Sequence, residues 1–137
     1  MYLIVSTLIA ALLQPSGWEI FANTQFKLEL VEELGFEIEM PIFDEEVKKK
    51  DGKEITLTGF YLPIKLDDDR ILISQLPYAN CFFCGGGGGQ ETIAEVVFKT
   101  PPRRFRIDEL LTVKGRLKLN VHDYDHPVFM IVDASTL

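Results

Sequence analysis

Hydrophobic and polar residues alternate along much of this chain. The clearest case is the segment 112–121, in which every odd position is apolar or glycine and every even position is polar. A period of two predicts a strand with one buried face. Four further segments carry strand-forming residues, namely 55–64, 71–73, 92–99 and 128–134. The pattern therefore predicts five strands in the second part of the chain.

Turn signals separate these segments and indicate their connections. The run Asp67-Asp68-Asp69 predicts a turn, because it lacks the alternation and glycine of a calcium-binding loop. Pro101-Pro102 ends the third strand, and residues 107–111 leave room for one helical turn. Gly59, inside the first strand, suggests a bulge or a bend. We predict a mainly β fold, a small five-stranded OB-like Greek-key barrel over residues 53–137.

Residues 18–52 predict a short N-terminal helix followed by an extended segment. Ser16 and Glu19 have the spacing of a capping box ahead of an apolar pair. Alternation then recurs over 26–30 and 36–42, which favours extended structure. The charged segment 44–50 is compatible with one helical turn or with a solvated loop.

Residues 1–17 form an apolar N-terminal segment that predicts a signal peptide. The first thirteen residues carry no charged side chain, and this run is too short to span a bilayer. Pro15-Ser16-Gly17 follows as a breaker, as after the apolar region of a secretory signal. The alternative is a buried N-terminal strand or helix, since no Lys or Arg precedes the run. We expect an exported, periplasmic protein without a stable membrane span in the mature chain.

Composition and charge narrow the range of partners. The 137 residues are 47% hydrophobic, enough for one domain with its own core. The net charge of −7 opposes nonspecific attraction to nucleic acid or anionic lipid. Six basic residues are interpreted as a solvated face: Arg103, Arg104, Arg106, Lys114, Arg116 and Lys118. We expect no nucleic-acid partner, but an envelope protein or a small ligand.

The candidate chemistry is concentrated in Cys81-Phe82-Phe83-Cys84, which holds the only two cysteines of the chain and precedes five glycines, 85–89. Two thiols with this spacing can bind one metal ion or close a short disulfide. Glycine allows close approach of the backbone to a ligand. Phe82, Phe83, Gly85 and Gly86 are predicted to form the ligand loop.

The two histidines of the chain, His122 and His126, lie in the turn predicted between strands four and five. In an OB topology strands two and four run in the same direction, so the loops after them emerge at one end of the barrel. This juxtaposition predicts a zinc-type metal site formed by Cys81, Cys84, His122 and His126. Each histidine alone is also compatible with an ordinary polar turn.

Two alternatives to a metal site stay open for the cysteine pair. In an oxidising compartment Cys81 and Cys84 can form a disulfide, and the barrel would then be a non-enzymatic binding or assembly module. Thiol-disulfide catalysis is disfavoured, because five glycines after Cys84 make a poor helix start and a redox thiol needs a lowered pKa. The sequence also contains no nucleophile elbow and no P-loop ending. We identify no catalytic residues.

Three segments carry a resemblance to a known family: 59–63 (GFYLP), 76–86 (LPYANCFFCGG) and 113–120 (VKGRLKLN). They resemble the bacterial domain-of-unknown-function family 3299 in its Bacteroidetes-type form, over about residues 18–137. The resemblance implies an exported protein with an OB-like barrel and implies no established activity. Where that form has a mixed Gly-Ala-Gly-Pro segment after the second cysteine, this chain has only glycine.

Overall fold

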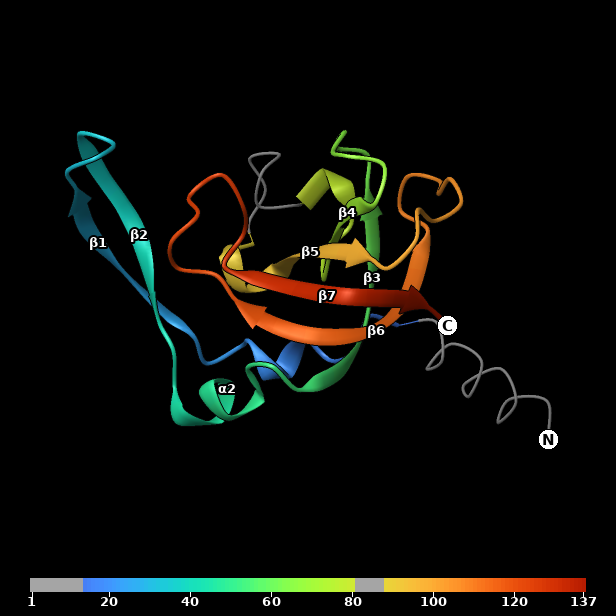
Figure 1. Ribbon diagram of the computed structural model, residues 1–137, viewed down its shortest axis with the longest axis horizontal. Coiled ribbons are helices and arrows are strands. Elements are labelled where there is room, and N and C mark those ends of the chain that lie inside the picture. Colours follow the sequence, from blue (N-terminus) through green and yellow to red (C-terminus); the bar gives the residue numbers. More distant parts are fainter. Residues whose placement is uncertain (1–13, 81–87) are drawn as a thin grey trace.

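The fold is a closed β-barrel with a two-stranded hairpin that projects from one end (Figure 1). The computed structural model describes residues 14–80 and 88–137. The strands are β1 (Gln25–Val31), β2 (Phe36–Ile42), β3 (Glu54–Leu62), β4 (Arg70–Ser74), β5 (Ile93–Phe98), β6 (Leu110–Leu119) and β7 (Phe129–Thr136). The helical elements are η1 (Trp18–Ile20), α2 (Glu45–Lys50), η2 (Tyr78–Asn80) and η4 (Gln90–Thr92).

The barrel strands follow the order β3-β4-β5-β7-β6, and β6 closes the barrel by pairing with β3. The β5–β7 pair is parallel, whereas the other four pairs are antiparallel. With β3 as the first strand, this is the 1-2-3-5-4 order of an OB-type Greek-key barrel. The predicted fold class is therefore confirmed. Because β4 and β6 are both antiparallel to β3, the loops that follow them leave the barrel at the same end.

Alternation along the strands fills the barrel interior. In β6 the buried residues Leu111, Val113 and Leu117 alternate with polar residues that face the solvent. The interior is completed by elements that precede the barrel in the chain. Trp18 is 2% exposed and Phe21 is fully buried, and the Phe21 ring stacks on Phe129 at 4.0 Å between centroids. The predicted N-terminal helix is thus present as the short η1, which contributes to the core.

The start of η1 differs from the capping box that the sequence predicts. Gly17 is the N-cap residue, with φ of 93°, and no side chain caps the helix. Ser16 instead forms an isolated β-bridge with Thr58 of β3. The prediction of a Ser16 cap was wrong because pairing with the barrel takes this residue away from the helix end.

The charged segment after the hairpin forms helix α2, the first of the two alternatives expected for it. The Asp44 carboxylate accepts a hydrogen bond of 2.9 Å from the backbone N–H of Val47 and so caps the helix. Val47 is 1% exposed and packs into the core. Glu45 and Lys50 lie at the two ends, where their charges favour the helix dipole.

The helical turn expected over 107–111 is absent from the described structure. The Tyr61 N–H donates to the Glu109 carbonyl at 2.9 Å, and the Asp108 N–H donates to the Tyr61 carbonyl at 3.2 Å. These bonds hold the segment against the end of β3, and β6 already begins at Leu110. The prediction of a helical turn was therefore wrong, because the backbone groups find partners in the barrel.

Gly59 in β3 marks a close approach of the Trp18 ring, and the β3–β6 ladder has no bulge there, which was one of the two features expected from the sequence. The ladder between β3 and β6 runs through Gly59 without a shift in register. A Cβ atom at this position would lie 2.8 Å from Cζ2 of Trp18 and 2.9 Å from the Ser74 carbonyl oxygen. Only glycine leaves room for the indole to lie on the strand.

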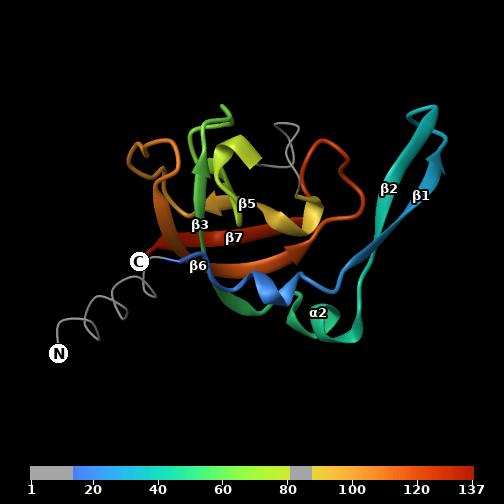
Figure 2. The same ribbon diagram turned by 180° about the vertical axis from the view of Figure 1, so that it is seen from behind.

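The β1–β2 hairpin stands apart from the barrel in both views (Figures 1 and 2). Its strands are antiparallel, with Val31 opposite Phe36, and Gly35 in the turn has φ of 76°. The extended structure expected over 26–30 and 36–42 is thus confirmed. Unlike the barrel strands, however, the hairpin leaves five large apolar residues exposed on its strands and turn: Leu28, Leu30, Leu34, Phe36 and Ile42.

Candidate functional site

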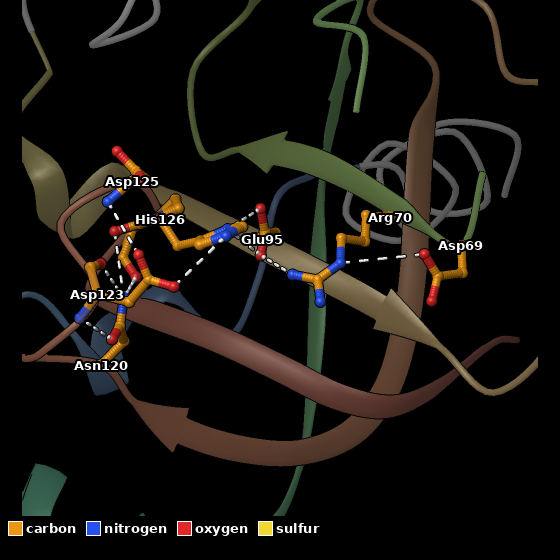
Figure 3. Close-up of polar contacts among 8 residues, drawn as sticks. Asp69, Arg70, Glu95, Asn120, Asp123, Asp125 and His126 are labelled. Carbon is orange, nitrogen blue, oxygen red and sulfur yellow. Dashed lines mark hydrogen bonds and ion pairs between the residues drawn. The ribbon is translucent and has the colours of Figure 1, made fainter. Parts of the chain in front are cut away.

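A buried carboxylate, Glu95, lies at the centre of the candidate site. Its neighbours Ala94 and Val96 on β5 belong to the barrel core. Since successive side chains of a strand point to opposite faces, Glu95 points outward from the barrel. It is nevertheless only 1% exposed. Two side chains from other elements, Arg70 and His126, approach its carboxylate from opposite sides (Figure 3).

Arg70 and His126 form hydrogen bonds with the two oxygens of the Glu95 carboxylate. Arg70 Nη1 donates to Oε2 at 3.1 Å, and His126 Nδ1 lies 2.9 Å from both oxygens. Arg70 also lies 3.9 Å from Asp69, measured from Nε to Oδ1. A buried carboxylate needs such partners, because desolvation penalises an unpaired charge. The three side chains therefore form one hydrogen-bonded row across β4, β5 and the β6–β7 loop.

The row determines which nitrogen of His126 is available for other chemistry. A carboxylate bonded to arginine accepts hydrogen bonds, so the assigned tautomer of His126 donates from Nδ1 to Glu95. Nε2 is then the ring nitrogen with the free lone pair. It lies 3.7 Å from Oδ2 of Asp123, beyond hydrogen-bond distance. His126 thus presents a fixed acceptor nitrogen beside a carboxylate.

The β6–β7 loop that carries His126 is held by Asn120. The Asn120 side-chain amide donates to the carbonyls of Asp123 at 2.8 Å, His126 at 3.2 Å and Pro127 at 3.1 Å. Its carbonyl accepts from the Asp123 N–H at 3.2 Å. Asn120 is 7% exposed, so these bonds are shielded from water. These hydrogen bonds therefore fix the backbone of the loop that carries the Asp123 and His126 side chains, and this loop is called the platform below.

A cavity of about 370 Å³ opens beside this platform. One wall is the β6–β7 loop, including His126, and the opposite wall is strand β2 of the hairpin. Gln90, which follows the glycine run after β4, also lines the cavity. The loops after β4 and β6 thus meet at one end of the barrel, as expected from the OB topology.

The structure describes only the two histidines of the predicted four-residue metal site. Cys81 and Cys84, together with Phe82, Phe83, Gly85 and Gly86 of the predicted ligand loop, lie outside the described residues. His122 is exposed, and its side chain makes no hydrogen bond within the described part of the chain. Within residues 14–80 and 88–137, no group of three or more His, Asp or Glu side chains is arranged to hold a metal ion. The four-residue site stays a prediction.

Sequence reasoning missed Glu95 and Arg70. Glu95 is the one charged residue in the segment 93–98, whose other members are all apolar. Such a charge inside an apolar strand is a usable signal, because it requires a partner when the strand is buried. The sequence does not indicate the partner, since Arg70 lies 25 positions away and His126 lies 31 positions away.

Three of the six basic residues interpreted as a solvated face form ion pairs, namely Arg103, Lys114 and Arg116. Arg103 lies 4.5 Å over the ring of Phe105 and forms an ion pair with Glu109. The side-chain hydrogen bond from Arg103 lowers the pKa of the Glu109 carboxyl. In the same way, the hydrogen bond from Arg116 lowers the pKa of Asp133. These cations already have acidic partners within the chain.

No helix among the described residues is long and apolar enough to cross a membrane. Comparisons with protein-family models, with curated proteins and with solved structures find no match. The resemblance to the bacterial family 3299 therefore stays a prediction from the sequence, and functional interpretation depends on the site itself.

Proposed function

We propose that this protein is a metal-binding module, which holds a zinc-type ion with the thiolates of Cys81 and Cys84 and with Nε2 of His126. The observation that carries the proposal is the bond between Glu95 and Nδ1 of His126 at 2.9 Å. A carboxylate on the second ring nitrogen is the usual partner of a metal-binding histidine, because it fixes the tautomer and raises the basicity of the ligand nitrogen.

The topology supports joining the cysteines to His126. The segment that contains them connects β4 to η4, and Gln90 at the start of η4 lines the same cavity as His126. Thiolate and imidazole together are a ligand set that suits zinc. We therefore assign the CxxC segment and the β6–β7 loop to one site.

The fourth ligand is His122 or Asp123. The distance of 3.7 Å between Asp123 Oδ2 and His126 Nε2 is close to the value of about 3.4 Å expected for two ligands of one tetrahedral zinc ion. His122 lies next to Asp123 in the same loop and is the choice that the sequence favours. A site with four protein ligands is closed, so its role would be structural and no catalytic activity is assigned to it.

Elemental analysis of protein purified under reducing conditions tests the proposal. We expect about one zinc per chain, and loss of the metal in Cys81→Ser, Cys84→Ser and His126→Ala. Cobalt substitution adds a second readout, because thiolate ligation produces a charge-transfer band that is lost with either cysteine. Asp123→Asn and His122→Ala identify the fourth ligand. Asp125→Asn is the matched control, since it changes the same charge in the same loop.

A clear result against the proposal is a protein without metal and without free thiol after denaturation. That outcome would favour the alternative, in which a Cys81–Cys84 disulfide closes the loop of a non-enzymatic binding or assembly module of the envelope. Metal retained in full by both Cys81→Ser and His126→Ala would also reject the site.

A further inference from the structure

Strand β2 pairs with β1 along one edge, and none of the described strands pairs with its second edge. Figures 1 and 2 both place β2 between β1 and the barrel, so this edge faces the barrel. The Glu39 carbonyl accepts a hydrogen bond of 3.2 Å from Nε2 of Gln90. In an antiparallel pair every second residue directs its backbone groups away from the partner strand. Glu39 and Glu37 therefore present their backbone to the open edge. Pro41 has no N–H, so the usable edge runs from Glu39 toward the turn.

The two faces of β2 at this edge have opposite character. Phe36, Ile38 and Met40 line the cavity of about 370 Å³ between the hairpin and the β6–β7 loop. Glu37 and Glu39 alternate with them, so their side chains point to the other face, while Glu39 also borders the cavity at the edge of the strand. An added strand would therefore meet apolar side chains on one face and carboxylates on the other.

Within the hairpin, the carboxylates of Glu37 and Glu39 have no cation beside them. The strand register puts Leu30 opposite Glu37 and Leu28 opposite Glu39. Neither glutamate takes part in an ion pair within residues 14–80 and 88–137, whereas Glu29 is paired with Lys27 at 3.0 Å. Leu28 and Leu30 are 62% and 63% exposed. This face thus combines two unneutralised charges with an apolar surface.

The negative charge of the hairpin distinguishes among three possible occupants of this edge, namely a second copy of the chain, a membrane and a partner protein. Residues 25–42 hold five glutamates and one lysine. A second copy of the hairpin would bring like charges together, and an anionic membrane would repel the hairpin for the same reason. A cationic partner is attracted instead.

We propose that an extended segment of a partner protein adds to the edge of β2 as a further strand, and that this segment alternates Lys or Arg with apolar residues. Residues directly opposite each other on paired strands share a face. The basic residues would lie opposite Glu37 and Glu39, close enough to pair with their carboxylates. The apolar residues would enter the cavity beside Ile38. Backbone hydrogen bonds to the edge supply affinity, as in other cases of strand addition.

The backbone pairing uses none of the proposed metal ligands, although the partner's apolar side chains would enter the cavity that His126 and Asp123 also line. A dye-labelled peptide, acetyl-Lys-Val-Arg-Val-Lys-amide, is a direct probe, with fluorescence anisotropy at physiological salt as the readout. We expect saturable binding to the wild type. In NMR titrations of the wild type, the amides of Glu37 and Glu39 should shift.

Two matched controls separate strand addition from general electrostatic attraction. The double variant Glu37→Lys, Glu39→Lys should bind the peptide about tenfold more weakly, because it places like charges opposite each other. Glu32→Lys, Glu33→Lys makes the same charge change in the turn and should change the affinity less than about twofold, since salt screens distant charges. A peptide of the same sequence with N-methyl groups on alternate amides should not bind.

Several outcomes would overturn the proposal. Equal binding of the N-methylated peptide would exclude backbone pairing, and an equal loss in the turn variant would show nonspecific attraction. No binding by the wild type would reject the edge as a peptide site. A wild type that dimerises in sedimentation velocity through this edge would make a second copy the occupant. Binding to phosphatidylglycerol vesicles through the hairpin would make a membrane the occupant. Circular dichroism melts of both double variants verify that the hairpin variants fold.

Discussion

Strand β6 of the barrel and the two hairpin strands share an alternating pattern of apolar and polar residues, but their apolar residues differ in burial. Each barrel strand has a neighbour on both sides, and the residues on its inner face are buried. Each hairpin strand has one neighbour, and Leu28, Leu30 and Phe36 are more than half exposed. An isolated two-stranded hairpin is marginally stable in water. Alternation therefore predicts the strand, whereas burial depends on what the apolar face can pack against.

The largest effect that would test this comparison is expected from Trp18→Ala. Trp18 is 2% exposed, donates from Nε1 to the Thr58 carbonyl at 2.7 Å and lies against Gly59. Its removal leaves a cavity in the core and should lower the free energy of unfolding by about 3–5 kcal/mol. The matched hairpin variant, Leu28→Ala, should cost less than about 0.5 kcal/mol, because that side chain is exposed. Urea unfolding followed by circular dichroism measures both. Equal losses would contradict the distinction between barrel and hairpin.

The second largest loss of stability is expected when the buried carboxylate of Glu95 is removed. Glu95→Ala removes the shared hydrogen-bond partner of Arg70 and His126 and should lower the free energy of unfolding by about 2–3 kcal/mol, since both side chains are partly exposed and water can reach them. The corresponding hairpin variant, Glu29→Ala, breaks an exposed ion pair with Lys27 and should cost less than about 1 kcal/mol. Chemical denaturation at neutral pH provides the comparison. If the free energy of unfolding falls equally in Glu95→Ala and Glu29→Ala, the row around Glu95 does not stabilise the fold.

Glycine substitutions give a smaller contrast. Gly59→Ala places a methyl group 2.8 Å from the Trp18 ring and 2.9 Å from the Ser74 carbonyl, and should cost about 1–3 kcal/mol. Gly35→Ala in the hairpin turn meets no atom within 4 Å, but it forces alanine to adopt φ of 76°. We expect a cost of about 1 kcal/mol there, from backbone strain alone. Thermal melts distinguish the steric clash at position 59 from the backbone strain at position 35. Asparagine tolerates the backbone conformation of position 35, so Gly35→Asn should be more stable than Gly35→Ala, whereas Gly59→Asn should not be more stable than Gly59→Ala.

The smallest effect is expected at the exposed face of the barrel. The hydrogen bond from Arg103, followed by that from the Arg106 backbone, holds the pKa of Glu109 below its ordinary value. A carboxyl with a lowered pKa in the folded state stabilises the fold above its unfolded pKa, and this contribution is lost as pH falls through the folded pKa. Arg103→Gln should therefore move the Glu109 pKa upward in an NMR titration and reduce the loss of stability on acidification. An unchanged Glu109 pKa would show that the ion pair does not form in solution.

The predictions from the sequence succeeded where local pattern and topology were sufficient. Strict alternation over 112–121 predicted the strand observed as β6, and the order of the strands predicted the closed barrel. They were wrong for 107–111, where the backbone pairs with Tyr61 instead of forming a helical turn, and for Ser16, which pairs with Thr58. In both cases backbone groups pair with a residue distant in the sequence, although the Glu109 N–H keeps a local hydrogen bond of 3.0 Å to the Arg106 carbonyl.

The sequence by itself determined the strands and the barrel topology that follows from their order, whereas metal or thiol chemistry at the CxxC segment stays a prediction. These properties depend on residue type and on spacing along the chain. Only the tertiary structure decided that His126 rather than His122 is hydrogen-bonded to Glu95, that Trp18 requires Gly59, and that no other described strand besides β1 pairs with β2 beside the cavity. Each of these depends on which distant residues the closed barrel brings within a few ångströms, and the local pattern does not contain that information.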